Sequence, residues 1–284
     1  MSRIVYVNGE YVPEEEAKVS IFDRGFLMAD AVYEVTSVID SKLIDFKAHM
    51  ARLQRSLDEL DMARPATDGE LETIHRELLS RNDVVEGMIY MQVTRGVADR
   101  EFTYPVGATP GLVLFTQAKP VVDTAAARNG IKVVTMPDIR WGRRDIKTVQ
   151  LLAPSMCKMA AKAAGADDAW LVEDGFVTEG TSNNAHIVTA DGTLVTRDLS
   201  NSILHGITRA AVLRFAREAQ IKIEERPFTV EEARNAAEAF ITSASSFVGP
   251  VVGIDDAVIG DGTPGPVAKR LREIYLDESM KTAT

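Results

Sequence analysis

Two residues in the middle of the chain, Lys147 and Glu179, have side chains that could do chemistry together. Lys147 follows an apolar, strand-like segment, 131–136, and a lysine that loses part of its hydration exposes a nucleophilic amine. Glu179 lies among small polar residues, 178–184, where its carboxylate could face a protonated ring nitrogen. Pyridoxal phosphate needs both groups, a lysine for a Schiff base and an acid opposite its pyridinium nitrogen. Spacing alone favours the simpler interpretation, a surface lysine and a loop glutamate.

Two glycine-containing segments could bind a phosphate. Gly206, Ile207 and Thr208 come at the start of a helical pattern, where backbone N–H groups and the helix dipole favour an anion. The simpler interpretation is that Thr208 only caps this helix. Residues 260–265 fit the pattern GxGxxG, but only residues 266–284 follow, too few for the rest of a dinucleotide-binding unit. We therefore interpret 260–265 as a turn before the last helix.

Composition argues against several other classes of protein. The formal net charge of −10 argues against a general nucleic-acid binder, because phosphate contacts need clustered cations. The chain has one cysteine, Cys157, which excludes a disulfide framework and is expected to be a buried, inert thiol. The N-terminus lacks the apolar stretch of a signal peptide and no segment approaches a membrane span, which predicts a cytoplasmic protein. None of the histidines has metal-site spacing: His49, His75, His186 and His205.

The elements that must position these residues fall into two α/β halves. Lys119-Pro120 breaks the pattern, which predicts an N-terminal domain, 1–120, and a C-terminal domain, 121–284, that carries Lys147. Asn8-Gly9 between two apolar segments is a strong hairpin signal, and Thr67 followed by Glu70 predicts a capped helix. In the first half we expect strands at 4–7, 10–12, 31–38, 43–46, 87–94 and 111–116, and helices at 48–60 and 67–80. In the second half we expect strands at 131–136, 169–172, 176–177, 185–189, 193–196, 221–223 and 239–242, and helices at 153–164, 208–219, 230–237 and 266–276.

Several separated motifs together resemble one known family. They are Asp-Ile-Arg-Trp at 138–141, Asp-Ile-Lys at 145–147, and Thr-Glu-Gly at 178–180 followed by Ser-Asn at 182–183. In order and spacing they resemble the fold-type IV (class IV) pyridoxal-phosphate aminotransferases, which include D-amino-acid, branched-chain and (R)-amine transaminases and aminodeoxychorismate lyase. The resemblance covers nearly the whole chain and is nearest to the D-amino-acid transaminases. It implies a two-domain α/β (α+β) fold with pyridoxal 5'-phosphate in the cleft between the domains.

The resemblance also implies roles for individual residues. Lys147 would carry the cofactor as an internal aldimine, Glu179 would keep its ring nitrogen protonated, and Tyr33 would line the active site. The residues implied to hold the rest of the cofactor are Arg52, Leu204, Ile207, Thr208, Ser243 and Ala244. A homodimer, with loops of the partner near the active site, is implied by the family alone.

The substrate side departs from the family pattern. In the loop after Thr94-Arg95-Gly96, Arg100 matches an arginine that D-amino-acid transaminases use for the substrate carboxylate. Phe102 stands where those enzymes have a histidine. We expect a ping-pong transaminase for a D-amino acid and a 2-oxo acid, of the D-alanine/2-oxoglutarate type. The alternatives are an (R)-selective amine:pyruvate transaminase, an aminodeoxychorismate lyase and, as a different class, a non-catalytic α/β binding protein.

Overall fold

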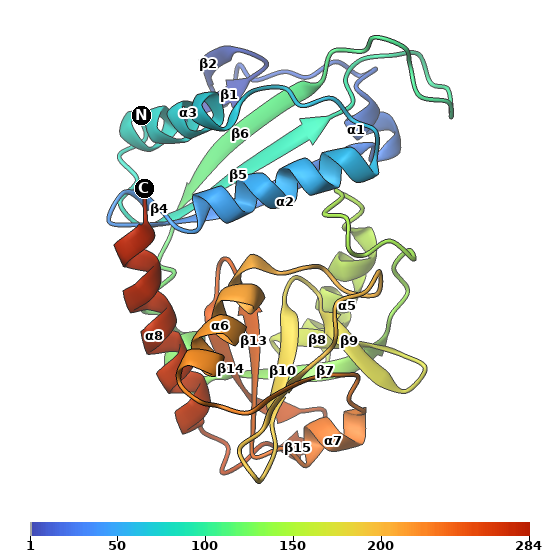
Figure 1. Ribbon diagram of the computed structural model, residues 1–284. Helices are drawn as coiled ribbons and strands as arrows, with labels where there is room; N and C mark the ends of the chain where they lie inside the picture. Colours follow the sequence, from blue (N-terminus) through green and yellow to red (C-terminus); the bar gives the residue numbers. More distant parts are fainter. Residues whose placement is uncertain (1) are drawn as a thin grey trace. The chain divides into compact units, whose positions relative to one another are not determined.

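The computed structural model describes residues 2–284 and groups them into two compact units. Unit 1 comprises residues 2–121, 146–150 and 282–284, and unit 2 comprises 122–145 and 151–281. Each unit combines a β-sheet with helices, so the predicted α/β class is confirmed (Figure 1). Within residues 2–284 no helix has the length and apolar character needed to cross a membrane.

Unit 1 is built on an antiparallel sheet of six strands, in the order β2-β1-β6-β5-β3-β4. The strands are β1 (Ile4–Val7), β2 (Glu10–Pro13), β3 (Ala31–Ile39), β4 (Lys42–Leu43), β5 (Gly87–Thr94) and β6 (Gly111–Ala118). The helices are α1 (Arg24–Met28), α2 (Phe46–Glu59) and α3 (Asp68–Arg81). Helices α2 and α3 pack on the sheet, α2 against β3 and α3 against β1 and β6 (Figure 1).

Local sequence explains several of these elements. Asn8 and Gly9 both have positive φ, at 49° and 107°, which is the conformation that a two-residue hairpin turn requires. Thr67 and Glu70 form the predicted capping box at the start of α3. Helix α2 buries residues spaced three and four apart, as expected of a helix with one apolar face.

Residues 146–150 pair with an edge of the first sheet. Tyr33 N donates to Lys147 O at 3.0 Å and Val149 N donates to Ala31 O at 3.2 Å. These bonds cover the start of β3, which β4 does not reach, since β4 pairs only with the far end of β3. Contacts therefore group Lys147 with unit 1, whereas the sequence placed it in the C-terminal half. The domain division at residue 120 stays a prediction.

Unit 2 contains a mixed sheet in the order β12-β11-β10-β13-β14-β7-β8-β9, with β15 beside β14. Its strands are β7 (Ile131–Pro137), β8 (Asp168–Glu173), β9 (Phe176–Gly180), β10 (Asn184–Val188), β11 (Leu194–Thr196), β12 (Ile223–Glu225), β13 (Glu238–Ser243), β14 (Phe247–Ile254) and β15 (Ala257–Val258). Its helices are α4 (Ala125–Asn129), α5 (Leu152–Ala163), α6 (Ile207–Glu218), α7 (Val230–Arg234) and α8 (Pro266–Thr282). Strand pairs β11–β12, β14–β7 and β7–β8 are parallel.

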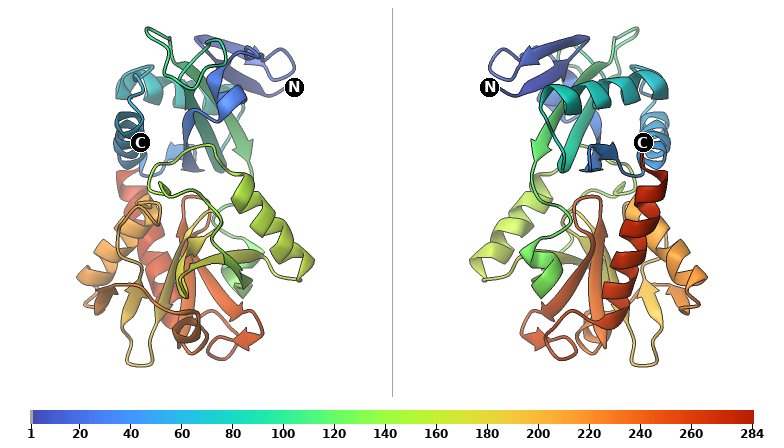
Figure 2. Two further views of the ribbon diagram at one scale, coloured as in Figure 1. Left: turned by 90° about the vertical axis from the view of Figure 1, so that its right-hand side faces the viewer. Right: turned by 90° about the vertical axis from the view of Figure 1, so that its left-hand side faces the viewer.

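Aromatic side chains join the helices of unit 2 to its sheet. Tyr275 on α8 contacts Phe215 on α6 and Phe247 on β14, with ring centroids 6.4 and 5.5 Å apart. Figure 2 shows α8 running along the strands that it covers. Burying three aromatic rings at one junction is a large source of hydrophobic stabilisation. The sheet that carries Glu179 is therefore firmly supported.

The segment with the GxGxxG pattern is a turn before α8, as predicted. Gly260 and Gly262 have φ of 58° and 81°. Gly265 leaves room for Glu238, because a Cβ there would lie 2.1 Å from the Glu238 carboxyl carbon. The Glu238 carboxylate accepts hydrogen bonds from Val267 N and Ala268 N, both at 3.0 Å, and so caps α8.

Candidate functional site

The Lys147 side chain lies over the ring of Tyr33. Its Nζ is 4.2 Å from the ring centroid, a cation–π distance, and the two residues are also joined through the backbone. Lys147 N also lies 3.5 Å from Ser56 Oγ on α2. The backbone of Lys147 thus contacts α2 and β3, and its amine lies over a ring carried by β3. The sequence-predicted pair of Lys147 and Tyr33 is in contact.

Tyr33 belongs to a row of aromatic rings that crosses the first sheet. It stacks on Tyr90 at 5.5 Å between centroids, and Tyr90 stacks on Phe115 at 4.9 Å. Burial, with a smaller contribution from Tyr33, raises the pKa of Tyr90, whose hydroxyl donates to Gln92 Oε1 at 2.8 Å. These stacked rings support the Tyr33 ring, over which the Lys147 amine lies.

Arg52 is held by a buried carboxylate, Glu34, that was not predicted from the sequence. Glu34 accepts from Arg52 Nε at 2.8 Å and Arg52 Nη2 at 2.7 Å, and His49 Nδ1 lies 2.7 Å from Glu34 Oε2. Burial raises the pKa of Glu34, but the Arg52 charge and the hydrogen bonds from Arg52 and His49 outweigh it and hold the pKa at about 2. Glu34 is therefore ionised and fixes the guanidinium of Arg52 in a forked arrangement.

Glu179 is buried, with 3% of its surface exposed, and its carboxylate accepts three hydrogen bonds. Arg140 Nη1 lies 2.5 Å from Oε1, while Asn184 Nδ2 and Leu204 N donate to Oε2 at 2.9 and 3.1 Å. Arg140 is itself held by Asp138, whose carboxylate accepts from Arg140 Nε and Nη2 at 2.9 and 2.7 Å. A carboxylate offers about four acceptor positions, so Glu179 has capacity for one more donor.

Burial and ion pairing oppose each other at Glu179. Burial raises the pKa of Glu179 above its ordinary value, and the Arg140 charge and the hydrogen bonds partly offset this. A further cation beside the carboxylate would favour its ionised form. The site therefore suits a group that carries a positive charge and one N–H donor.

Asn184 connects Glu179 to the segment before α6. Its Nδ2 donates to Glu179 Oε2 and also to Leu204 O, both at 2.9 Å. Its backbone pairs with Thr242, the residue before Ser243, in the β10–β13 ladder. Gly206 is required here, because a Cβ would lie 2.0 Å from Asn184 Oδ1. Asn184 thus brings the predicted segments around Glu179, Leu204 and Ser243 together.

Ile207 and Thr208 open α6, as predicted. Gly206 is the N-cap residue in an extended conformation and contributes no side-chain hydrogen bond to the helix start. Thr208 is 3% exposed and Ser243 lies at the end of β13, where its Oγ accepts from Ser246 N at 3.1 Å. Ala244 follows in the turn after β13. A helix of this length with an uncapped first turn favours an anion.

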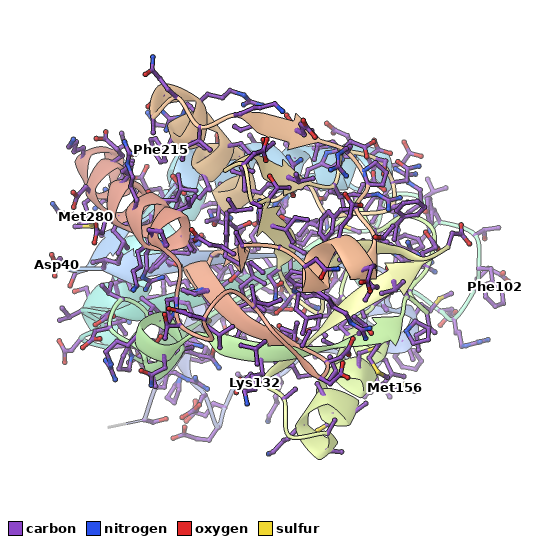
Figure 3. The ribbon with its side chains drawn as sticks, turned by 90° about the horizontal axis from the view of Figure 1, so that it is seen from below. Asp40, Phe102, Lys132, Met156, Phe215 and Met280 are labelled. Carbon is purple, nitrogen blue, oxygen red and sulfur yellow. The ribbon has the colours of Figure 1, made fainter. Side chains whose placement is uncertain are left out.

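Arg100 lies in the exposed loop between β5 and β6. Its guanidinium carbon is 5.5 Å from the centroid of the Phe102 ring. Glu101, which could have tied up Arg100 as a surface pair, instead accepts from Phe102 N at 2.7 Å. Within residues 2–284 Arg100 has no ion-pair partner. Phe102 is 76% exposed, and Figure 3 shows its side chain pointing away from the loop.

The environment of Cys157 tests another expectation from the sequence. Cys157 is 4% exposed on α5 beside Ala161 and Leu171, and burial raises the pKa of its thiol, so the predicted buried cysteine is confirmed. Among residues 2–284 no group of three or more His, Cys, Asp or Glu side chains could hold a metal ion.

Four residues of the candidate site were not predicted from the sequence: Glu34, Asp138, Arg140 and Asn184. Each was visible as a polar residue within or next to a noticed motif, for example Glu34 inside the strand of Tyr33. Their importance depends on partners that are distant in the chain, such as Arg140 and Glu179. A rule that seeks a cation for every buried carboxylate would have suggested Arg140.

Comparison with known proteins shows the class to which the chain belongs. A family model described as amino-transferase class IV matches residues 31–254, and the protein belongs to this family. The family resemblance inferred from the sequence motifs is therefore confirmed.

Individual proteins of this family are similar to the chain over nearly its full length. The chain is 38% identical to D-alanine aminotransferase of Bacillus licheniformis over 284 residues, covering 98% of this chain and 99% of that protein. It is 39% identical to D-alanine aminotransferase of Staphylococcus haemolyticus over 272 residues, covering 95% of each. Among solved structures, a branched-chain amino acid aminotransferase complexed with N-(5'-phosphopyridoxyl)-L-glutamate, from the organism abbreviated T.th., has a TM-score of 0.88 at 29% identity, covering 99% of this chain and 95% of that chain. Branched-chain amino acid aminotransferase of Escherichia coli has a TM-score of 0.90 at 23% identity, covering 98% and 94%, and shows the same fold.

Proposed function

We propose that the protein is a pyridoxal-phosphate-dependent transaminase that moves an amino group from a D-amino acid, of the D-alanine type, to a 2-oxo acid such as 2-oxoglutarate. The observation that carries this proposal is the sequence identity of 38% and 39% with two D-alanine aminotransferases over nearly the full length of the chain. Separate assays of D- and L-alanine with 2-oxoglutarate test it. The proposal would be contradicted if L-alanine were turned over as fast as D-alanine, or if neither were turned over.

The side chains present suit the cofactor. Glu179 has capacity for one more donor and an environment that favours a cation, which matches a pyridinium N–H. The start of α6, with Ile207 and Thr208, suits a phosphate. Ser243 ends β13, the strand that pairs with β10 at Asn184, and Ala244 follows it. Arg52 supplies a cation for the same phosphate, and Leu204 an apolar side chain for the ring. When bound, the cofactor would accept the electron pair left when the substrate loses its Cα proton.

The protein's own residues then have distinct tasks. Lys147 would hold the cofactor covalently through Nζ, and the same amine would take the proton from the substrate Cα. Tyr33, stacked between Lys147 and Tyr90, would orient that amine. Glu179, fixed by Arg140 and Asn184, would hold the proton on the ring nitrogen. The reaction requires no metal ligand from the chain.

Arg100 is proposed to bind the substrate carboxylate, because it is a cation without an ion-pair partner among residues 2–284. A charge-assisted hydrogen bond contributes roughly 1.5–3 kcal/mol. Arg100→Ala is therefore expected to lower kcat/KM for D-alanine and D-glutamate by about tenfold or more. The half-reaction of (R)-1-phenylethylamine, which lacks a carboxylate, should change little. Single-turnover rates for each donor measure this, and an equal loss for amino acid and amine would refute the role.

Phe102 supports a second candidate, an (R)-amine:pyruvate transaminase. An aromatic ring in place of the family's histidine removes a polar partner for a carboxylate and adds an apolar surface. The chemistry at Lys147 would be unchanged. A higher kcat/KM for (R)-1-phenylethylamine than for D-alanine would favour this candidate, whereas pyruvate released from aminodeoxychorismate without an amino acceptor would identify the lyase.

The protein is also proposed to form a homodimer. Two adjacent segments of unit 1 expose apolar side chains, and Ala98 N donates to Phe22 O between them at 3.2 Å. The exposed residues are Val19, Ile21, Phe22, Phe26, Val97, Phe102, Tyr104 and Val106. Clusters of this kind mark association surfaces in soluble proteins.

Sedimentation equilibrium tests the dimer. We expect the mass of two chains for the parent protein and a shift toward one chain for Phe22→Asp, because a charge would be buried without a partner. Val258→Asp on β15, where the parent residue is 67% exposed, is the control and should leave the mass unchanged. A single-chain mass for the parent protein at micromolar concentration would exclude a stable dimer.

A further inference from the structure

A buried ion cluster lies beneath the loop that carries Arg100. Asp30 Oδ2 accepts hydrogen bonds from Arg24 Nε and Arg95 Nε, each at 2.7 Å. Arg24 and Arg95 are 2% and 5% exposed, so both guanidinium groups have been removed from water. One carboxylate oxygen between two arginines leaves the cluster with a net positive charge. Its remaining N–H groups must therefore find other acceptors.

Those acceptors include backbone carbonyls of the Arg100 loop. Arg24 Nη1 donates to Glu101 O at 2.6 Å and lies 3.5 Å from Thr103 O. Arg95 has its guanidinium carbon 3.5 Å from the centroid of the Tyr104 ring. The cluster thus contacts the chain directly after Arg100, at residues 101, 103 and 104. These residues carry exposed side chains, but their positions are fixed by contacts with the buried Arg24 and Arg95.

The other side of the cluster is anchored to rigid parts of unit 1. Arg95 Nη1 and Nη2 donate to Asp61 O and Leu60 O, just after α2, at 3.0 and 2.7 Å. Arg24 N donates to Gly96 O at 2.9 Å. Gly96 has φ of 100°, and a Cβ there would lie 2.0 Å from Thr109 O, so the two ends of the loop are pressed together. The two ends of the loop, at Gly96 and Thr109, are therefore in contact, and its middle is held by the two arginines.

We propose that the Asp30, Arg24 and Arg95 cluster is the positioning device for Arg100 and so determines selectivity for substrates with a carboxylate. This inference rests on the role proposed for Arg100. A guanidinium in an exposed loop loses much of its binding free energy if it must first be ordered. Tying the carbonyl of residue 101 to a buried arginine orders the backbone beside Arg100 in advance. Arg24, Asp30 and Arg95 are positioning residues, since none of them needs to touch the substrate.

The test is Asp30→Asn, which keeps the size of the side chain but removes the charge that holds both arginines. Two measurements are made on the holoenzyme. We expect KM for D-alanine to rise roughly tenfold with kcat nearly unchanged, and the (R)-1-phenylethylamine half-reaction to stay within about twofold, because small displacements of a binding group cost about this much or more. We also expect trypsin to cleave after Arg100 several times faster, which reports loop order without using activity.

Two further variants make the result decisive. Asn82→Ala removes hydrogen bonds to Ile4 N, Ile4 O and Leu78 O elsewhere in unit 1 and should change neither the KM ratio nor cleavage after Arg100. Arg24→Lys keeps a charge beside Asp30 but loses the forked donors, so it should reproduce the Asp30→Asn effect. If Asp30→Asn slows amine and amino acid equally, or leaves cleavage after Arg100 unchanged, the inference is overturned. If Arg100→Ala itself shows no selectivity, the proposed role of Arg100 fails and takes this inference with it.

Discussion

Replacing Lys147 with alanine is expected to abolish transamination. The substitution removes both the amine proposed to hold the cofactor and the base proposed to move the Cα proton, and acid–base catalysis alone contributes about 10²- to 10⁴-fold. Steady-state rates with D-alanine and 2-oxoglutarate measure the loss. Borohydride reduction of the parent protein with bound cofactor, followed by peptide mapping, should label Lys147.

Two comparisons separate chemistry from packing at this position. Lys147→Arg keeps a cation over the Tyr33 ring, where Nζ now lies 4.2 Å from the centroid, but it should be as inactive as the alanine variant. Lys158, which pairs with Asp168 at 3.2 Å and is half exposed, is the control, and Lys158→Ala should remain active. A borohydride label on Lys119, Lys132 or Lys158 in place of Lys147 would show that the assignment is wrong.

Glu179→Gln is expected to lower kcat by about tenfold or more while cofactor affinity changes less. An amide cannot hold the ring proton as an ion pair, and a loss of ~1.4 kcal/mol in the transition state is a tenfold loss of rate. The amide NH₂ would also face donors, since Arg140 Nη1, Asn184 Nδ2 and Leu204 N all point at this carboxylate. The phosphate contacts proposed at the start of α6 are left intact.

The measurement is kcat at saturating cofactor together with the cofactor dissociation constant. Glu173→Gln is the matched control, because Glu173 on β8 also pairs with an arginine, accepting from Arg144 Nη2 at 2.7 Å, and has no proposed role in the site. We expect that control to stay within about twofold of the parent. Activity of Glu179→Gln within the same range would identify Glu179 as a structural residue only.

Local signals in the sequence predicted much of the fold. The hairpin turn at Asn8-Gly9 and the capping box that begins at Thr67 depend on residues within a few positions of each other. Strand β14 was not predicted, because Gly249 and Pro250 lie inside it and both disfavour a central strand. The structure accommodates Pro250 because pairing with β7 begins only at Val251, so the missing N–H is not needed on that side.

The candidate site was predictable only in part, for a similar reason. The motifs identified Lys147, Tyr33, Glu179 and the start of α6, and in each unit the structure brings predicted residues together. The side chains that fix them are distant in sequence, such as Glu34 for Arg52. Sequence spacing carries no information on such pairs, since they form only when strands and helices pack. Whether all of these residues act on one cofactor stays a proposal.

The pairing of residues 146–150 with β3 has a consequence for synthesis of the chain on the ribosome. All six strands of the first sheet lie before residue 119, and β5 pairs with one edge of β3 along its length. The other edge of β3 is covered at its start only by residues 146–150, which follow much later in the chain. Until these emerge, the nascent chain presents an unpaired C=O at Ala31 and an unpaired N–H at Tyr33, a template for pairing with another strand. Slow translation between residues 119 and 146 would therefore prolong the interval in which this edge can aggregate or recruit a chaperone.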